Sequence, residues 1–470
     1  MKTLAEALVE RWHGLQPEDV PYPILRRAAL CFEDTLAVAH AAAHLDVGTA
    51  ATKVAAATGQ GPATIWGTQH KVLASEAAFA NGMLSHALDY DDLHPGGIMH
   101  SSAFIVPTAI ALGEQTGASG RQVLAASIAG YEVAARLGRL APGPFQDNGF
   151  QSTAVLGVFG AATVAARLLG LDQRQAVNAL GIAGSMAAGL MEFLADGSDV
   201  KQMHPGWAAH SGIRAAQLAM AGFSGPSSVF EGRFGIFRSY VGLTIDPNAV
   251  AGFDGSHWEV EDMAPKPYPA CLCVHPQVQA ILDLRAREAV SPDRIDAIRE
   301  IRCDIPEFYI GLVYEPAARK VEVSTPYEAR FSAPYCMARA LLDGRLDVAS
   351  FAPDKLSDPK AAAIARKVKF RAEALPEFPQ SFPARVTVTN TDGSTAECYI
   401  AHNLGSAGNP FSSEQFAEKF QTCVTPLLDS NGSMALWRSV RALPDAPNLN
   451  ALSLALLVGA EDRYRQHQLS

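Results

Sequence analysis

Long runs of small apolar residues with helical spacing constrain the fold of this chain more than any other feature. Four such runs, rich in alanine and glycine, lie between residues 103 and 194 and are separated by short polar breaks. Small side chains let helix backbones approach closely, so these helices are expected to pack tightly and to be buried on several sides. The sequence therefore predicts a large all-helical domain. The runs are Ala103–Gln115, Gln122–Leu137, Ser152–Leu169 and Gln173–Leu194.

The pattern changes near Pro265. Apolar and polar residues alternate at 300–305 and 385–389, and a hairpin turn is indicated at Asp392-Gly393, while helical spacing recurs at 277–289 and 329–342. A chain of 470 residues exceeds the usual size of a single core, so two domains are expected. The predicted fold class is mainly α: a large all-helical domain (1–265), a smaller inserted α+β lid domain (266–403), and a helical return to the first domain (404–470).

Composition and charge argue against several classes of partner. The net charge of -10 comes without a basic patch, so neither nucleic acid nor an anionic membrane is expected to bind. Glu6 and Glu10 lie too early in the chain for a secretory signal, and Arg167 interrupts the most hydrophobic run. We expect a cytoplasmic protein.

The cysteines and glycines indicate no metal or cofactor. Seven scattered cysteines, an odd number, fit reduced thiols better than a disulfide framework, and Cys271-Leu-Cys273 has the wrong spacing for a zinc knuckle. The glycines of Glu231–Phe237 lack the preceding strand and following helix that a nucleotide-binding loop requires. No metal and no cofactor are therefore predicted.

The segment from Asp89 to Ser102 is the first candidate for chemistry. It places three carboxylates and two imidazoles in fourteen positions between alanine-rich helical runs. An aspartate can orient an imidazole and stabilise its protonated form, so Asp89 with His100 or His94 would make a base or acid near neutral pH. The alternative is an acidic cluster that caps a helix, in which Asp91 and Asp92 only solvate a turn.

Two further segments supply cations. Lys201 and His204 stand just ahead of a helix that is expected to begin near Trp207, which would suit the binding of a carboxylate. Lys266 and Tyr268 lie among three prolines, which hold the backbone more rigidly than a linker requires. The alternative for the first segment is a surface lysine beside a packed histidine. The alternative for the second is a stiff connector with an exposed lysine.

A fourth segment, Gly149-Phe-Gln-Ser-Thr153, is explained by an N-cap at Ser152. Together, the segments favour proton abstraction next to a carboxylate in a polyanionic substrate, with lysines that hold carboxylates and stabilise an enolate-like charge. A non-catalytic binder of polycarboxylates and a metal-dependent, aconitase-like hydratase are the alternatives.

The same segments resemble the MmgE/PrpD family, which includes 2-methylcitrate dehydratase, cis-aconitate decarboxylase and iminodisuccinate epimerase. Asp89-Tyr-Asp-Asp followed by His100-Ser-Ser is similar to the family's Asp-Phe-Asp-Asp-Thr and His-Pro-Ser, and Lys201-Gln-Met-His-Pro-Gly-Trp-Ala-Ala to its Lys-x-x-His-x-Gly-x-Ala-Ala. Lys266-Pro-Tyr-Pro-Ala-Cys and Tyr327-Glu-Ala-Arg-Phe-Ser also match. The resemblance implies a homodimer, catalysis without a cofactor, and active-site positions for Asp89, His100, Lys201 and Lys266.

Two positions depart from the family pattern. Leu93 replaces a threonine, and Gln151 replaces a histidine. Leu93 cannot form a side-chain hydrogen bond and Gln151 cannot titrate, so the shared first step is better supported than any known substrate.

The leading hypothesis is a lyase of the 2-methylcitrate dehydratase type that acts on a di- or tricarboxylic acid. In it His100, oriented by Asp89, moves a proton while Lys201 and Lys266 hold carboxylates or stabilise charge. An iminodisuccinate-like epimerase and a cis-aconitate decarboxylase-like enzyme are alternatives. The residues expected to bind substrate are His204, Tyr268, Gln151 and Ser102.

Overall fold

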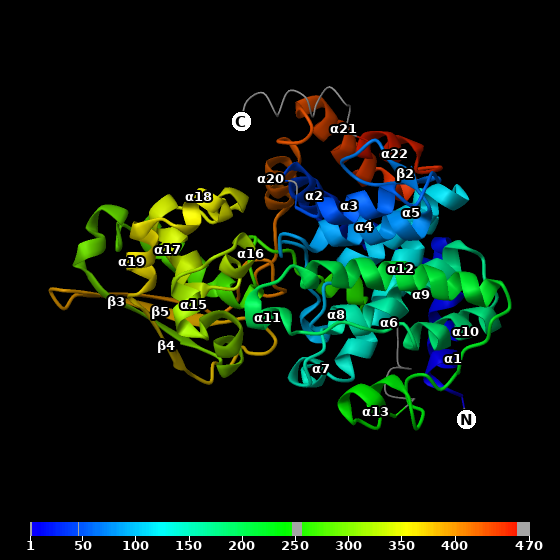
Figure 1. Cartoon of the computed structure of the whole chain (residues 1–470), viewed down its shortest axis with the longest axis horizontal. Coiled ribbons are helices and arrows are strands. Elements are labelled where there is room, and N and C mark those ends of the chain that lie inside the picture. The colour runs from blue at the N-terminus through cyan, green and yellow to red at the C-terminus, as the bar shows by residue number, and fades with distance from the viewer. Residues whose placement is uncertain (1, 46, 247–255, 458–470) are drawn as a thin grey trace.

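The computed structural model describes residues 2–45, 47–246 and 256–457 and is mainly helical, which confirms the predicted fold class (Figure 1). Most helices form one large unit. Its elements before residue 265 are α1 (Leu4–Leu8), α2 (Tyr22–His44), α3 (Thr49–Ala56), α4 (Ala74–His86), α5 (Ser102–Thr116), α6 (Gly120–Arg139), α7 (Pro144–Asp147), α8 (Ser152–Val155), α9 (Gly157–Leu168), α10 (Gln173–Gly184), α11 (Phe193–Asp196), α12 (Val200–Met220) and α13 (Ile236–Val241), with a two-stranded β1 (Ala63–Thr64) and β2 (Lys71–Val72).

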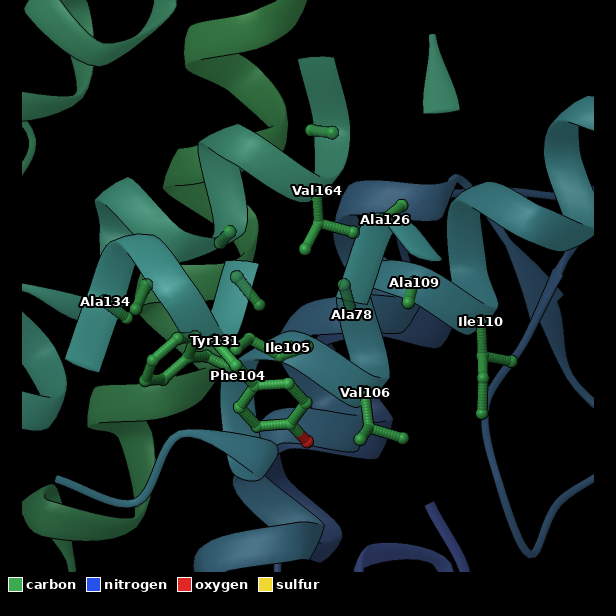
Figure 2. Close-up of a cluster of buried hydrophobic side chains, with 14 of the residues drawn as sticks. Ala78, Phe104, Ile105, Val106, Ala109, Ile110, Ala126, Tyr131, Ala134 and Val164 are labelled. Atoms are coloured by element: carbon green, nitrogen blue, oxygen red, sulfur yellow. The ribbon is translucent and has the colours of Figure 1, made fainter. Parts of the chain in front are cut away.

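The core of this unit lies where α4, α5, α6, α9 and α12 pack together. Phe104, Ile105, Tyr131 and Val164 are fully buried there among alanines (Figure 2). Glycine permits the closest approach: a Cβ on Gly82 of α4 would lie 2.6 Å from the Cα of Gly206 in α12. This contact brings the end of α4 beside the beginning of α12, where two of the candidate segments lie.

A smaller α+β unit follows the connector near Pro265 and lies to one side of the helices in Figure 1. Its sheet has the order β4-β3-β5-β6, with β3 and β4 parallel and the other pairs antiparallel. The predicted strands are confirmed, and β4 is an addition. The elements are α14 (His275–Ala286), β3 (Ile298–Ile305), α15 (Ala317–Val321), α16 (Pro326–Ala329), α17 (Ala333–Asp343), α18 (Pro353–Leu356), α19 (Pro359–Ala365), β4 (Val368–Ala372), β5 (Ala384–Asn390) and β6 (Thr395–Ile400).

The chain then returns to the helical unit. α20 (Ser413–Val424) begins with a capping box between Ser412 and Gln415 and packs against α2, and Figure 1 shows the blue and orange helices in contact. α21 (Ser430–Arg441) and α22 (Asn450–Leu456) complete it. The last part of the predicted helical return, 458–470, lies outside the described residues.

The buried apolar side chains of the described residues form two clusters. The first draws on residues 4–263 and 420–456, and the second on residues 270–400 together with Leu93. No helix in the described ranges is long and apolar enough to cross a bilayer.

Two helical predictions near the candidate site need correction. The run Gln173–Leu194 is not one helix: α10 ends at Gly184, and the chain turns back so that Leu190 pairs with Phe150. α12 begins at Val200 instead of near Trp207, so Lys201 lies in its first turn. Pro205 lies inside this helix, where it has no N–H to donate to the backbone oxygen of Lys201 one turn earlier.

Candidate active site

Asp89 is the centre of a buried charge cluster. It follows α4 in a left-handed conformation, with φ of 48°, which aspartate tolerates better than most residues. Lys201 Nζ donates to Asp89 Oδ1 at 2.6 Å, while Lys266 Nζ lies 3.3 Å from Oδ2 and donates to the Asp89 backbone oxygen at 2.9 Å. All three residues are at least nine-tenths buried.

The charges of this cluster do not cancel. Burial by itself raises the pKa of the Asp89 carboxyl, but the ammonium groups of Lys201 and Lys266 outweigh it and hold the pKa well below its usual value. One carboxylate therefore faces two cations, which leaves an excess positive charge in a buried place. A carboxylate of a bound molecule would balance it.

Asp91 forms a second, adjacent cluster with two imidazoles. Its Oδ2 lies 2.9 Å from His86 Nδ1 and 3.1 Å from His100 Nδ1, and the two rings meet edge to face with centroids 4.6 Å apart. This corrects the expected pairing of His100 with Asp89, because the Asp89 oxygens face the two lysines. Asp91 is fully buried and does not solvate a turn.

The arrangement makes His100 an uncharged base. Burial lowers the pKa of His100 to about 4 despite the neighbouring Asp91 carboxylate. Because Nδ1 faces that carboxylate, the ring proton is assigned to Nδ1, and the lone pair of Nε2 remains available. The backbone N–H of His100 donates to Thr153 Oγ1 at 3.1 Å, which fixes the residue against α8.

His204 and Gln151 are brought together. His204 Nδ1 hydrogen-bonds Gln151 Oε1, so the Gln151 amide NH2 remains a donor. Burial lowers the pKa of His204 to about 3. The His204 ring meets that of Phe193 edge to face, with centroids 6.1 Å apart. His204 lies on α12 three residues after Lys201, and Gln151 reaches it from the residue before α8.

Ser102 and Tyr268 are placed elsewhere. The Ser102 hydroxyl is fully buried and bonds both Asp92 Oδ2 and Tyr131 Oη at 2.6 Å, so its hydrogen-bonding capacity is used within the protein. The Tyr268 ring packs edge to face on His275, at 5.3 Å, in the second hydrophobic cluster. Neither residue has a described contact with the Asp89 or Asp91 cluster.

Three residues near the site were not among the predicted ones. His86 shares the carboxylate of Asp91, and its position one turn before Asp89 at the end of a helical run was a usable signal. Arg330 is buried, donates to the Pro269 backbone oxygen at 2.6 Å, and interacts electrostatically with Asp89. Tyr327 is also buried close to both carboxylates. Arg330 and Tyr327 lie in a family motif, but no local pattern placed them at this site.

The comparison with known domain families agrees with this geometry. The MmgE/PrpD N-terminal domain matches residues 6–246, and the MmgE/PrpD C-terminal domain matches residues 268–444. The chain belongs to the MmgE/PrpD family. The resemblance read from the motifs is confirmed.

Named relatives of this MmgE/PrpD chain cover nearly its whole length. It is 28% identical to cis-aconitate decarboxylase from Mus musculus over 97% of this chain and 94% of the relative. It is 28% identical to cis-aconitate decarboxylase from Homo sapiens over 97% and 95% of the two chains. Cis-aconitate decarboxylase from Aspergillus terreus is 27% identical, with coverage of 89% and 88%.

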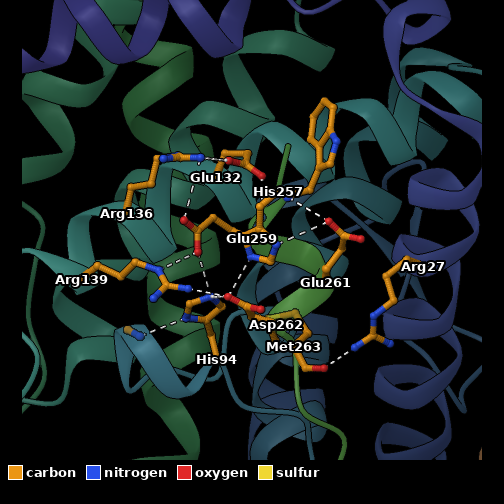
Figure 3. Close-up of polar contacts among 12 residues, drawn as sticks. Arg27, His94, Glu132, Arg136, Arg139, His257, Glu259, Glu261, Asp262 and Met263 are labelled. Carbon is orange, nitrogen blue, oxygen red and sulfur yellow. Dashed lines mark hydrogen bonds and ion pairs between the residues drawn. The ribbon is translucent and has the colours of Figure 1, made fainter. Parts of the chain in front are cut away.

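The loop that carries this MmgE/PrpD site is anchored by a network of ion pairs (Figure 3). His94 Nδ1 accepts from the Gly97 N–H at 3.0 Å, and its Nε2 lies 3.1 Å from Glu259 Oε2. Arg139 Nε donates to the same carboxylate at 2.8 Å. Both nitrogens of His94 are therefore engaged, which leaves His100 as the candidate base of the two.

Leu93 links the loop to the connector that carries Lys266. Its backbone N–H donates to the Ala264 oxygen at 2.9 Å, and the Ala264 N–H donates back at 2.7 Å. The Leu93 side chain joins the second hydrophobic cluster. In this MmgE/PrpD chain, the apolar residue at the family's threonine position packs between the two units instead of bonding at the site.

Within the described ranges, two groups of side chains have the spacing of metal ligands. Ligand atoms of His86, Asp89 and His100 lie within 4.8 Å of one another, as do those of His94, Glu259 and Asp262. Cations already face the carboxylates in both places: Lys201 and Lys266 at Asp89, and Arg139 at Glu259 and Asp262. Their charge opposes a divalent ion, so the residues fit such an ion poorly; the absence of a metal stays a prediction.

Proposed function

We propose that this MmgE/PrpD protein is a lyase that acts on a di- or tricarboxylic acid without a cofactor, by moving a proton at a carbon next to a carboxylate. The observation that carries the proposal is the buried pair of clusters: two ammonium groups share one carboxylate, directly beside an imidazole whose Nδ1 faces Asp91. The first cluster suits a substrate carboxylate, and the second suits proton transfer.

The chemistry can be written from these groups. His100 Nε2 takes the proton, and the electron pair of the broken C–H bond moves into the adjacent carboxylate, whose added charge Lys201 and Lys266 stabilise. Asp91 stabilises the imidazolium that forms. When the electron pair returns, it forms a carbon–carbon double bond and expels the neighbouring hydroxyl group, which takes the proton from the His100 imidazolium and leaves as water.

Decarboxylation uses the same groups in a different order. The carbon–carbon bond to one carboxylate breaks, carbon dioxide leaves, and the electron pair spreads over the chain toward a remaining carboxylate held by the lysines. A protonated His100 then delivers a proton to carbon. The named relatives favour this outcome, on a substrate like cis-aconitate. Dehydration of a substrate like 2-methylcitrate is the second candidate. It is favoured because an uncharged His100 can accept the proton that dehydration removes.

The test is turnover of a panel of di- and tricarboxylic acids, followed by NMR in deuterated water. This measurement distinguishes carbon dioxide loss, water loss, epimerisation and simple hydrogen exchange. His100→Ala should abolish turnover, whereas His210→Ala, a partly exposed histidine paired with Glu76, should retain it. Binding without turnover by the unmodified protein would make it a non-catalytic polycarboxylate binder, and full activity of His100→Ala would remove His100 as the base.

We also propose that the protein is a cytoplasmic homodimer. Large apolar residues are exposed along α12 and the segments next to it, which supports an apolar contact between copies. Sedimentation velocity at micromolar concentration tests this, and a single monomeric species would contradict it. The exposed residues are Leu190, Val200, Trp207, Leu218, Met220 and Phe223.

A further inference from the structure

Tyr327 has a buried hydroxyl group that finds no hydrogen-bond partner in the described part of the chain. The residue is the second of α16 and is 5% exposed. Its Oη finds no donor or acceptor within the ranges 2–45, 47–246 and 256–457. Leaving a buried hydroxyl unpaired is unfavourable, so such a group in a site often awaits a ligand.

The hydroxyl belongs to a residue that lines a pocket between the two units. Phe193, Leu194 and Gly197 form one wall, and Tyr327 and Phe331 belong to the other. The pocket is narrow and partly open to solvent, and it lies where the helical and α+β units meet.

The pocket adjoins the charge cluster at Asp89. The ring of Phe331 lies 5.6 Å from that of Tyr327, and Lys201 Nζ stands 4.8 Å from the centre of the same Phe331 ring. Asp89 and Asp91 both act electrostatically on Tyr327. Burial first, and then these carboxylates, raise the pKa of the Tyr327 phenol well above its usual value, so the group stays protonated and can donate.

The other polar side chains that line the pocket are already engaged. Arg319 Nε donates to Glu328 Oε1 at 2.8 Å, and its guanidinium also donates to the backbone oxygens of Ala195 and Asp196. Lys320 Nζ donates to two backbone oxygens at 2.9 Å, and Glu328 Oε2 accepts from the Ser324 N–H at 2.8 Å. Among the described pocket-lining side chains, Tyr327 is thus the polar one left to bind a ligand.

We propose that the Tyr327 hydroxyl donates a hydrogen bond to a carboxylate oxygen of the bound polycarboxylic acid and so determines which acids this enzyme accepts. The proposal rests on the proposed function. In it Lys201 and Lys266 hold the carboxylate next to the reacting carbon, while Tyr327 holds another carboxylate in the pocket beyond Phe331. An acid with a single carboxylate lacks this second contact and should be discriminated against.

The experiment compares Tyr327→Phe with Tyr309→Phe. Tyr309 is also buried, and its hydroxyl has no partner among the described side chains and backbone, but it stacks on Phe382 inside the α+β unit and does not line the pocket. Binding of cis-aconitate and of citrate is measured by calorimetry, and KM and kcat are measured on the best acid of the panel. Tyr327→Phe should weaken binding about 10-fold, the usual size of one hydrogen bond, and raise KM more than it lowers kcat. Tyr309→Phe should match the unmodified protein.

Thermal unfolding supplies an independent readout. Because the hydroxyl has no partner among the residues that the structure describes, Tyr327→Phe should melt at the same temperature or higher without ligand, and should lose most of the rise that cis-aconitate gives the unmodified protein. A clear fall in melting temperature without ligand would show a structural bond and overturn the proposal. Unchanged binding and KM in Tyr327→Phe would also overturn it. If the unmodified protein neither binds nor converts any acid of the panel, both this proposal and the proposed function fail.

Discussion

His100 Nδ1 lies 3.1 Å from Asp91 Oδ2, and the same oxygen lies 2.9 Å from His86 Nδ1. One buried carboxylate thus serves two imidazoles, while Asp89, two residues earlier, serves two lysines. The two carboxylates of this short loop therefore have different roles: Asp89 pairs with the lysines, and Asp91 orients the base.

Replacing Asp91 by asparagine should remove the charge that stabilises the His100 imidazolium. We expect kcat to fall by about 10² to 10⁴, the usual contribution of a general base, with a much smaller change in KM. Steady-state kinetics on the best acid of the panel measures this. Asp354→Asn, an exposed change on α18, is the control. A drop below threefold in Asp91→Asn would show that Asp91 does not support the base.

The pH dependence of kcat/KM should show a loss of activity only at low pH. Burial lowers the pKa of His100 to about 4, so the basic form of the free protein is present above that value and is lost as the pH falls through it. For proton abstraction, kcat/KM should therefore be flat from about pH 6 to pH 5 and fall near pH 4. Measurement at constant ionic strength tests this. A rate that rises as the pH falls would instead indicate that a protonated His100 delivers the proton, as decarboxylation requires.

Substitutions of Asp89 and Lys201 should have non-additive effects on the free energy of unfolding. Asp89→Asn leaves both Lys201 and Lys266 without their carboxylate, and we expect a loss of about 3 to 5 kcal/mol in the free energy of unfolding. Combining it with Lys201→Met should cost less than the sum of the two single changes, by about 1 to 3 kcal/mol, because one of the two unpaired ammonium groups is then absent. Urea unfolding of the four proteins gives the coupling energy, and strict additivity would contradict the ion pair.

Ser102→Ala separates a structural hydroxyl from one that binds substrate. The hydroxyl bonds Asp92 and Tyr131, so its loss should cost about 1 to 3 kcal/mol of stability and leave KM within a factor of two or three. Thermal unfolding and kinetics on the same preparation measure both quantities. A large rise in KM with unchanged stability would return Ser102 to the substrate-binding set.

Activity should survive removal of metal ions. The carboxylates in both groups of potential ligands face lysine or arginine, so no metal is expected to take part. Exhaustive dialysis against a chelator should leave turnover unchanged, and added Mg²⁺, Fe²⁺ or Zn²⁺ should not raise it. Loss of activity that one of these ions restores would favour the aconitase-like alternative.

Local chemistry made much of this protein predictable from its sequence. Helical spacing of small residues predicted the helical core, alternation predicted β3 and β5, and the hairpin turn at Asp392-Gly393 indicated β6. The unusual density of acid, imidazole and ammonium groups singled out the segments of Asp89, His100, Lys201 and Lys266. Each of these signals lies within a few neighbouring residues, where spacing alone decides the outcome.

The pairing of those groups was decided only by tertiary structure. Asp89, Asp91 and Asp92 are nearly equivalent in sequence, yet the left-handed turn at Asp89 directs its carboxylate to Lys201 and Lys266, Asp91 faces His86 and His100, and Asp92 faces Ser102. The close approach of α4 and α12 through Gly82 and Gly206 sets these distances. Tyr327 arrives from a separate unit more than two hundred residues later. Electrostatic and hydrogen-bond energies depend on distances through space, and the spacing of residues along the sequence does not determine those distances.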